Sequence, residues 1–398
     1  MRTISFVLAI LVCIPIASSL DLSTYERELW QDRLNPSKFE EIFSQNKTDE
    51  FINGLRTVGE KTKQTLKKAA VFGKQLSSES KPNFNNFFGY IIKFNKEYND
   101  ELKERFEKFS NSLKKIEADQ KDNPEAEFGP TQFSDLSPEE FIKVYTGVQG
   151  EDHVKQLHGV EEGSDGEELI FRSKRSIPAN FSWVAKNKVT GIRDQGRCGC
   201  CYAFAAVGAV ESQYAIKTGK LVDLSEQQVI SCTYGNTTLH GSGGGGCSAG
   251  SAPSILQYIE DNGVCAEADF KYVSGTDLSI PACVSEPAVT KITKFKRIPE
   301  NSEIALEIYL HFVGPVVTYV DATPLQHYKS GILNAKEPSG GWTINHAIVT
   351  VGWGTSNNVS YWLIKNQWGS SWGEQGYFRV KKGVNQLNLA QYNWVPYK

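Results

Sequence analysis

The sequence has almost no net charge and no long apolar run after its first twenty residues. Its 398 residues include 43 Lys and Arg against 46 Asp and Glu, a formal net charge of −3. This balance excludes nucleic-acid binding driven by bulk positive charge. Because no apolar run of about 18 residues follows the first twenty, we expect no membrane-spanning helix. Histidine is scarce, with six in total, so few residues are candidates for acid–base chemistry near neutral pH. A hydrophobic content of 40% excludes a wholly disordered chain.

Residues 1–19 have the pattern of a secretory signal peptide. Arg2 precedes an apolar stretch over residues 4–16, and small residues follow at 17–19. We therefore expect the chain to enter the secretory pathway, to become lysosomal or extracellular, and to form disulfide bonds. Four sequons are then predicted glycosylation sites, at Asn46, Asn180, Asn236 and Asn358.

The rest of the chain divides into three regions by composition. Residues 20–146 are rich in Glu, Lys, Phe and Leu, and the apolar residues of 87–120 have helical spacing. Residues 147–175 are polar and acidic, which is typical of an exposed linker. From residue 176 onward Gly, Trp, Tyr and Val increase, with strand-like runs at 347–352 and 361–365. Helices followed by a mixed region predict an α+β protein with an N-terminal attachment.

The cysteines give the main indication of chemistry. Without Cys13 of the leader, seven remain, and an odd number means that at least one thiol is free or pairs between chains. Cys198, Cys200 and Cys201 lie at the start of a helical stretch that runs to about Lys217. A cysteine at a helix N-terminus favours the thiolate that nucleophilic chemistry needs. A metal site is the alternative, but no second Cys/His pair has zinc-finger spacing, so we expect no metal.

Several segments carry motifs that occur in one order along the chain. They are residues 177–183, residues 195–204 with Gln195 and Cys201, residues 224–232, residues 345–347 with His346, and residues 365–377 with Asn366 and Trp368. In this order they resemble the mature N-terminus and the active-site segments of papain-like cysteine peptidases, the cathepsin L-like branch in particular. The resemblance implies a helical subdomain around the Cys201 helix, a β-barrel-like subdomain around His346, and a substrate cleft between them.

The resemblance also implies the catalytic roles. Cys201 would be the nucleophile, held as a thiolate by protonated His346, and Asn366 would orient the imidazole. Gln195 would donate a hydrogen bond to the oxyanion. Trp368 would cover the Asn–His pair. No cofactor is implied.

The N-terminal region resembles the inhibitory prodomain of the same zymogens. Four residues match its helical motif, namely Glu101, Arg105, Phe109 and Ile116, and three match the motif after it, namely Gly129, Phe133 and Asp135. Three positions depart from these motifs, because Ser112, Gln120 and Thr131 stand where Asn is usual. In the peptidase segments, Ala249 stands where the family usually has Gly. We expect residues 83–146 to cover the cleft in reverse direction, as an intramolecular inhibitor. A coiled coil is the alternative, but heptads are not sustained. Residues 20–82 form an extension of unknown role.

Further site residues follow from the resemblance alone. It pairs Cys198 with Cys247 and Cys232 with Cys283, leaves Cys265 unpaired, and leaves out the family's third bridge because Leu387 occupies the place of one partner. The main specificity pocket would be lined by Gly250, Ser251, Ala252, Tyr319 and Tyr392. No acidic residue is among them, so we expect aliphatic side chains to be preferred over Arg or bulky aromatic ones. Cys200, Tyr202 and Gln367 also depart from the family pattern. None of these changes removes a catalytic group, so we expect them to affect the rate and specificity of the enzyme rather than to abolish its activity.

Residues 172–175 form a basic tetrad, Arg-Ser-Lys-Arg, immediately before the expected mature N-terminus. Its last residue, Arg175, is a predicted cleavage site for a furin-like convertase, which would leave a peptidase domain over 176–398. We therefore expect a monomeric cysteine endopeptidase made as a secreted zymogen, with protein or peptide substrates, its own prodomain and cystatin-type inhibitors as partners, and no nucleic acid. The alternative is a catalytically impaired homologue that acts as a binding or inhibitory protein.

Overall fold

The computed structural model describes residues 48–148, 177–235 and 245–398, which form two compact units. The first unit ends at Ser110 and the second begins at Asn111, so the boundary falls within helix α6, Leu102–Asp122. The predicted signal peptide, the sequons at Asn46 and Asn236, and the processing site at Arg175 lie outside the described residues. Within the described residues, no helix has the length and apolar character needed to cross a membrane.

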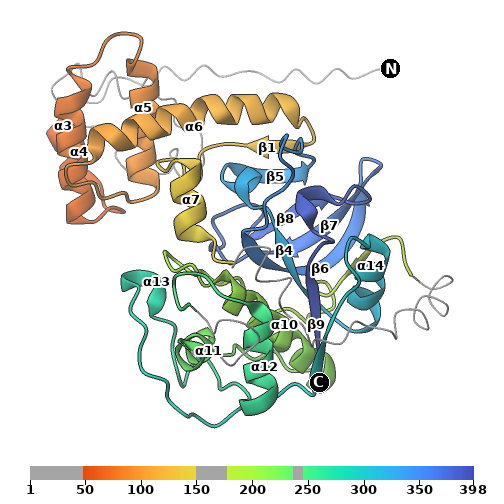
Figure 1. The fold of residues 1–398 in the computed structure, drawn as a ribbon. Helices are drawn as coiled ribbons and strands as arrows, with labels where there is room; N and C mark the ends of the chain where they lie inside the picture. Colours follow the sequence, from red (N-terminus) through yellow and green to blue (C-terminus); the bar gives the residue numbers. More distant parts are fainter. Residues whose placement is uncertain (1–47, 149–176, 236–244) are drawn as a thin grey trace, which may run out of the picture. The chain divides into compact units, whose positions relative to one another are not determined.

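The first unit is built from helices around an aromatic core. Its helices are α3 (Thr48–Gly54), α4 (Glu60–Gly73), α5 (Lys81–Lys93) and the beginning of α6 (Figure 1). The Phe87 ring lies between the Phe106 and Phe109 rings, with centroids 5.5 and 5.4 Å away. The helical spacing predicted over 87–120 is therefore confirmed, but as two helices that pack against each other across a turn.

The second unit contains a helical part centred on α10, Cys201–Thr218. Most of α10 is buried, and ten of its 18 residues are Ala, Val, Phe or Tyr. The helix ends at Gly219, whose φ of 78° suits a glycine. Figure 1 shows α10 beside α11 (Glu226–Thr233) and α12 (Ala252–Asn262), which contact it and each other. The short α13, Ser274–Asp277, follows. The helix that was predicted to run from the cysteine cluster to about Lys217 is confirmed.

The other part of the second unit is a nine-stranded sheet in the order β1-β5-β8-β7-β6-β4-β9-β3, with β2 paired to β6. The strands are antiparallel except for the pair β5 and β8 among those described. The predicted strand-like runs fall in β6 and β7. Helix α14, Glu303–Phe312, packs against β4 and β6. The strands are β1 Ala126–Phe128, β2 Phe181–Ser182, β3 Lys294–Arg297, β4 Val316–Val320, β5 Tyr328–Leu333, β6 His346–Ser356, β7 Val359–Lys365, β8 Tyr377–Lys381 and β9 Asn393–Tyr397.

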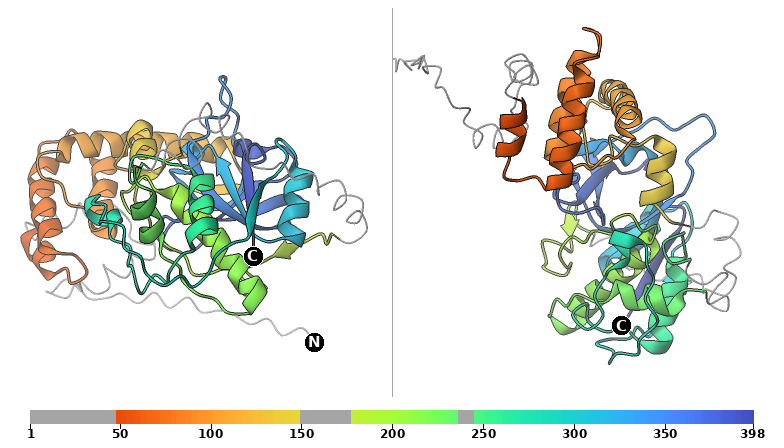
Figure 2. Two further views of the ribbon diagram at one scale, coloured as in Figure 1. Left: turned by 60° about the horizontal axis from the view of Figure 1, so that its bottom comes forward. Right: turned by 90° about the vertical axis from the view of Figure 1, so that its left-hand side faces the viewer.

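The segment from α6 to residue 148 packs against the sheet within the second unit. Strand β1 pairs with β5, and Gln120 holds the turn before it by donating to the Ala126 carbonyl at 2.8 Å. Helix α7, Pro138–Tyr145, starts with a capping box formed by Ser137 and Glu140. Figure 2 shows α6 and α7 from two further sides. The fold is the expected α+β arrangement, with a helical part and a sheet part preceded by helices.

Candidate active site

Cys201 is the first residue of α10, and its thiol is fully buried. The helix packs against β6, and backbone hydrogen bonds from Ala347 and Gly147 reach the thiol. Burial outweighs these bonds and raises the pKa of Cys201 to about 12. The neighbouring Cys200 points elsewhere, with its sulfur 3.2 Å from the Tyr272 hydroxyl. The two adjacent thiols therefore have different surroundings.

His346 and Asn366 come together from the start of β6 and the end of β7. The His346 Nε2 atom lies 2.9 Å from Asn366 Oδ1, and the Trp368 ring stacks on the imidazole with centroids 4.7 Å apart. Burial lowers the pKa of His346 to about 4, although the bond to Asn366 works in the opposite direction. The antiparallel pairing of β6 with β7 is what brings these two residues, twenty positions apart, into contact.

Both backbone polar groups of Gln195 are hydrogen-bonded. Its N–H donates to the Gln367 carbonyl at 2.9 Å, and its carbonyl accepts from the Tyr272 hydroxyl at 2.7 Å. The side-chain Nε2 donates to the carbonyls of Cys198 at 2.8 Å and Tyr145 at 3.2 Å. Gln195 can therefore present an N–H donor to a peptide carbonyl in the cleft.

The end of α7 and the residues after it, 145–148, lie beside these groups. The Tyr145 carbonyl accepts from Trp368 Nε1 at 3.1 Å as well as from Gln195. The Gly147 carbonyl accepts from the Gly250 N–H at 2.9 Å, and the Gly147 N–H lies 3.2 Å from the Asn345 carbonyl. The first two residues assigned to the exposed linker, Gly147 and Val148, are thus bound in the cleft.

The predicted pocket residues lie together but are all buried in this state. Gly250, Ser251, Ala252, Tyr319 and Tyr392 come from the start of α12, β4 and the segment before β9. The Ala252 N–H donates to the Tyr319 hydroxyl at 2.9 Å, which links α12 to β4. Ala249, where the family usually has Gly, has a φ of 91°, a conformation that costs an L-residue about 1–2 kcal/mol.

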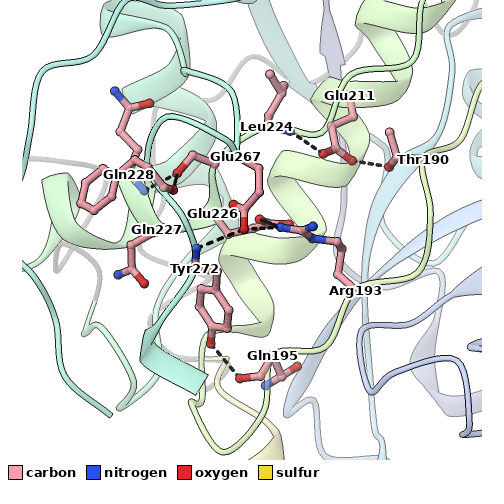
Figure 3. A network of polar contacts seen from close by, with 12 residues as sticks. Thr190, Arg193, Gln195, Glu211, Leu224, Glu226, Gln227, Gln228, Glu267 and Tyr272 are labelled. Carbon is pink, nitrogen blue, oxygen red and sulfur yellow. Dashed lines mark hydrogen bonds and ion pairs between the residues drawn. The ribbon is translucent and has the colours of Figure 1, made fainter. Parts of the chain in front are cut away.

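A polar network is connected to Gln195 through Tyr272, whose hydroxyl donates to the Gln195 carbonyl and whose N–H donates to Glu267 (Figure 3). Arg193 pairs with Glu226 at 3.2 Å and with Glu267 at 2.7 Å. Glu211, on α10, accepts hydrogen bonds from the Leu224 N–H and the Thr190 hydroxyl, which also accepts from Lys365 at 3.0 Å. Burial, with repulsion from Glu211, raises the pKa of Glu226 to about 8 despite Arg193. Lys365 directly precedes Asn366, so the network fixes the loop that carries the Asn.

Two disulfides join segments of the helical part, Cys198–Cys247 and Cys232–Cys283. Cys200, Cys201 and Cys265 are free and buried. Asn180 and Asn358 are exposed. Within the described residues, no three His, Cys, Asp or Glu side chains gather as metal ligands.

Two features of the site were not predicted from the sequence. The Gln367 side chain reaches the backbone next to His346, donating to the Ala347 carbonyl at 2.8 Å. His327, just before β5, lies buried with its Nδ1 3.1 Å from the Ser134 hydroxyl. Gln at position 367, where the family usually has Ser, indicated a departure at the site. The contacts of its side chain depend on strand register and could not be predicted from the sequence.

Comparison with known families matches nearly all of the described chain. Residues 177–397 match the family described as Papain family cysteine protease. Residues 87–141 match the Cathepsin propeptide inhibitor domain. The first match covers the two parts that contain Cys201 and His346, and the second covers the second half of α5, all of α6 and β1, and the first half of α7.

Individual relatives cover most of this chain. A viral cathepsin of Mamestra configurata nucleopolyhedrovirus is 36% identical over 329 residues, which are 78% of this chain and 89% of the relative. The structure of digestive procathepsin L 3 of Tenebrio molitor larval midgut superposes with a TM-score of 0.64 at 25% identity, over 85% of this chain and all of that one. A recombinant stem bromelain precursor gives a TM-score of 0.67 at 30% identity, over 79% of this chain and 99% of that one.

Proposed function

This chain belongs to the papain family of cysteine proteases and carries a cathepsin-type propeptide, and we propose that it hydrolyses peptide bonds with Cys201 as the nucleophile. His346 is the proton carrier and Asn366 holds its ring. The observation that carries the assignment is the hydrogen bond of 2.9 Å between His346 and Asn366, which the Trp368 ring covers. The next residue on the strand, Ala347, makes a backbone hydrogen bond to the Cys201 thiol, so the thiol lies close to this pair.

The chemistry follows from these contacts. The Cys201 thiolate attacks the scissile carbonyl carbon, and the carbonyl oxygen becomes an oxyanion that accepts from Gln195 Nε2 and the Cys201 N–H. When the intermediate collapses, the C–N bond breaks and imidazolium His346 gives its proton to the leaving amine. His346 then takes a proton from water, which attacks the thioester and regenerates the Cys201 thiolate with imidazolium. Asn366 Oδ1 accepts from Nε2–H throughout, so the ring keeps its orientation.

The bound prodomain segment supports both the cleft assignment and the zymogen state. Its Tyr145 carbonyl accepts from Gln195, the donor that the oxyanion needs. In the same state burial disfavours both charged groups, raising the pKa of Cys201 and lowering that of His346. The thiol and imidazole are therefore neutral until the segment leaves and water enters.

The test is hydrolysis of a fluorogenic peptide by the activated enzyme. We expect Cys201→Ala to abolish turnover and the matched control Cys200→Ser, which restores the residue usual in the family, to retain it. A wild-type enzyme that folds and loses its prodomain but hydrolyses nothing would instead favour the binding-protein alternative. Turnover that survives in Cys201→Ala would reject the nucleophile assignment.

We also propose that the pocket formed by Ser251, Ala252, Tyr319 and Tyr392 prefers aliphatic side chains two positions before the cleaved bond. Tyr319, bonded to Ala252, takes up the floor of the pocket. No acidic side chain is among these residues, so an Arg side chain finds no charge partner in the pocket. A peptide-library profile dominated by Arg at that position would count against the proposal.

Maturation in the secretory pathway is a further part of the proposal. A furin-like convertase would cut after Arg175, since the basic tetrad ends the acidic stretch just before residue 177, where the protease match begins. Secretion also fits the two disulfides, Cys198–Cys247 and Cys232–Cys283. N-terminal sequencing of the secreted Cys201→Ala variant tests whether a convertase cuts after Arg175, because only an external protease can process that variant. Unprocessed product would show that the enzyme matures itself.

A further inference from the structure

Gln367 follows the catalytic Asn at a position where the family usually has Ser, and its side chain is buried. The β6–β7 pairing runs down to Val349 opposite Lys365. Continued by two residues, the same antiparallel register sets Ala347 opposite Gln367. At that point the chain leaves the sheet to form the loop that carries Asn366.

The Gln367 side chain supplies the hydrogen bond that the departing strand no longer makes. Its Nε2 donates to the Ala347 carbonyl at 2.8 Å and lies 3.4 Å from His346 Nε2. The Ala347 carbonyl accepts the bond, so the nitrogen of the amide must be the atom that faces β6. A Ser hydroxyl sits two bonds nearer the backbone than Nε2 and would not span this gap.

The backbone of Gln367 contacts the other two members of the site. Its N–H donates to Asn366 Oδ1 at 3.0 Å, which leaves that oxygen's other lone pair for His346. Its carbonyl accepts the Gln195 N–H at 2.9 Å. One residue therefore joins the strand of His346, the Asn that orients it and the oxyanion donor.

We propose that Gln367 is a positioning residue, whose side-chain bond to Ala347 keeps the His346 ring and Asn366 in register. The inference rests on the proposed function. The groups against the imidazole are Asn366 and Gln367 after β7 and the Trp368 ring; α10 contributes Cys201 and β4 contributes Tyr319, both beside Ala347. Apart from the Cys201 thiolate of the activated enzyme, none of these groups is charged, so a carboxylate introduced at position 367 is expected to change the pKa of His346 measurably.

The experiment measures the rate at which iodoacetate alkylates Cys201 in the activated enzyme, as a function of pH. Because iodoacetate is an anion, imidazolium His346 favours its reaction, so the upper limb of the profile marks the pH at which that ring loses its proton. We expect Gln367→Leu to lower the rate about five- to tenfold, the equivalent of one hydrogen bond, and to move the upper limb down by about 0.5 pH unit. Gln367→Glu puts a carboxylate beside Nε2 and moves the limb upward instead.

Two further variants make the result decisive. Gln213→Leu is the matched control, because Gln213 is equally buried on α10 and donates to the Val313 carbonyl at 3.0 Å; it lowers the melting temperature but leaves the profile unchanged. If Gln367→Leu does not fold, Gln367→Ser, the residue usual in the family, takes its place. An unchanged profile in the Leu or Ser variant, or a loss of thermal stability alone, would overturn the proposal. Wild-type enzyme with no Cys201-dependent alkylation would instead reject the proposed function.

Discussion

Gly147, the first residue after the predicted prodomain, lies against the backbone of Gly199 just before α10. A Cβ atom built on it would lie 1.9 Å from the Gly199 carbonyl oxygen and 2.4 Å from its carbon. These are backbone atoms beside Cys200 and Cys201, and a rigid backbone cannot give way as a flexible side chain can. The segment therefore seats in the cleft only because this residue has no side chain.

We predict that Gly147→Ala weakens inhibition in the zymogen. Displacing the segment around position 147 costs about 1–3 kcal/mol. This raises the fraction of zymogen molecules with an open cleft by about five- to a hundredfold, so that Cys201 reacts at neutral pH. The measurement is alkylation of the intact zymogen by a thiol reagent. Gly129→Ala is the control, because a Cβ there meets the Lys329 side chain at an ordinary 3.4 Å. Equal alkylation of both variants would contradict the prediction.

At the scale of elements, the turn before α7 docks onto the start of β5 through buried polar groups. The Gly129 N–H donates to the His327 carbonyl at 3.0 Å, and Thr131 donates to the Gln326 carbonyl at 2.6 Å. His327 Nδ1 lies 3.1 Å from the Ser134 hydroxyl. Burial, with a smaller effect of Lys115, lowers the pKa of His327 to about 3.

We predict that protonation of His327 helps to release the prodomain in acid. Because its pKa is lowered in the docked state, docking is fully stable above the free value of 6.5 and weakens as the pH falls from there toward 3. At two pH units below the free value, the docking free energy falls by about 3 kcal/mol when the released ring is fully hydrated.

The His327→Gln variant keeps a polar side chain opposite Ser134 but binds no proton in this range. Its zymogen should activate at a lower pH than wild type, measured as the pH at which the half-time of activation reaches a fixed value. The same activation profile in both proteins would show that other groups set the pH dependence.

The elements of the peptidase could be predicted from sequence wherever a motif or a period marked them. The helix that starts at Cys201 and the strands β6 and β7 fall where the spacing indicated. The bonds of Gln367 and His327 could not be predicted, because each joins segments whose proximity depends on strand register. The break between α5 and α6 was also missed as a boundary, since apolar spacing continues across residues 87–120 in both helices.

At the scale of the whole chain, helices α3 and α4 precede the residue at which the propeptide match begins. Their residues are part of the aromatic core of the first unit, since Phe72 of α4 contacts Phe84 and Phe106 with centroids 6.0 and 5.8 Å away. The expected extension over 20–82 therefore includes, in its described part, helices that complete the prodomain core.

The central claim is that one thiol, Cys201, acts with His346 in a site that the prodomain closes. Treating the activated enzyme and the zymogen with an epoxide thiol-protease probe, then mapping the modified peptide by fragment-ion sequencing, tests it most directly. The account predicts one label per activated molecule, on Cys201 and not on Cys200, little label on the zymogen at neutral pH, and loss of labelling in His346→Ala. Labelling mainly on Cys200, or labelling that His346→Ala leaves unchanged, would contradict it.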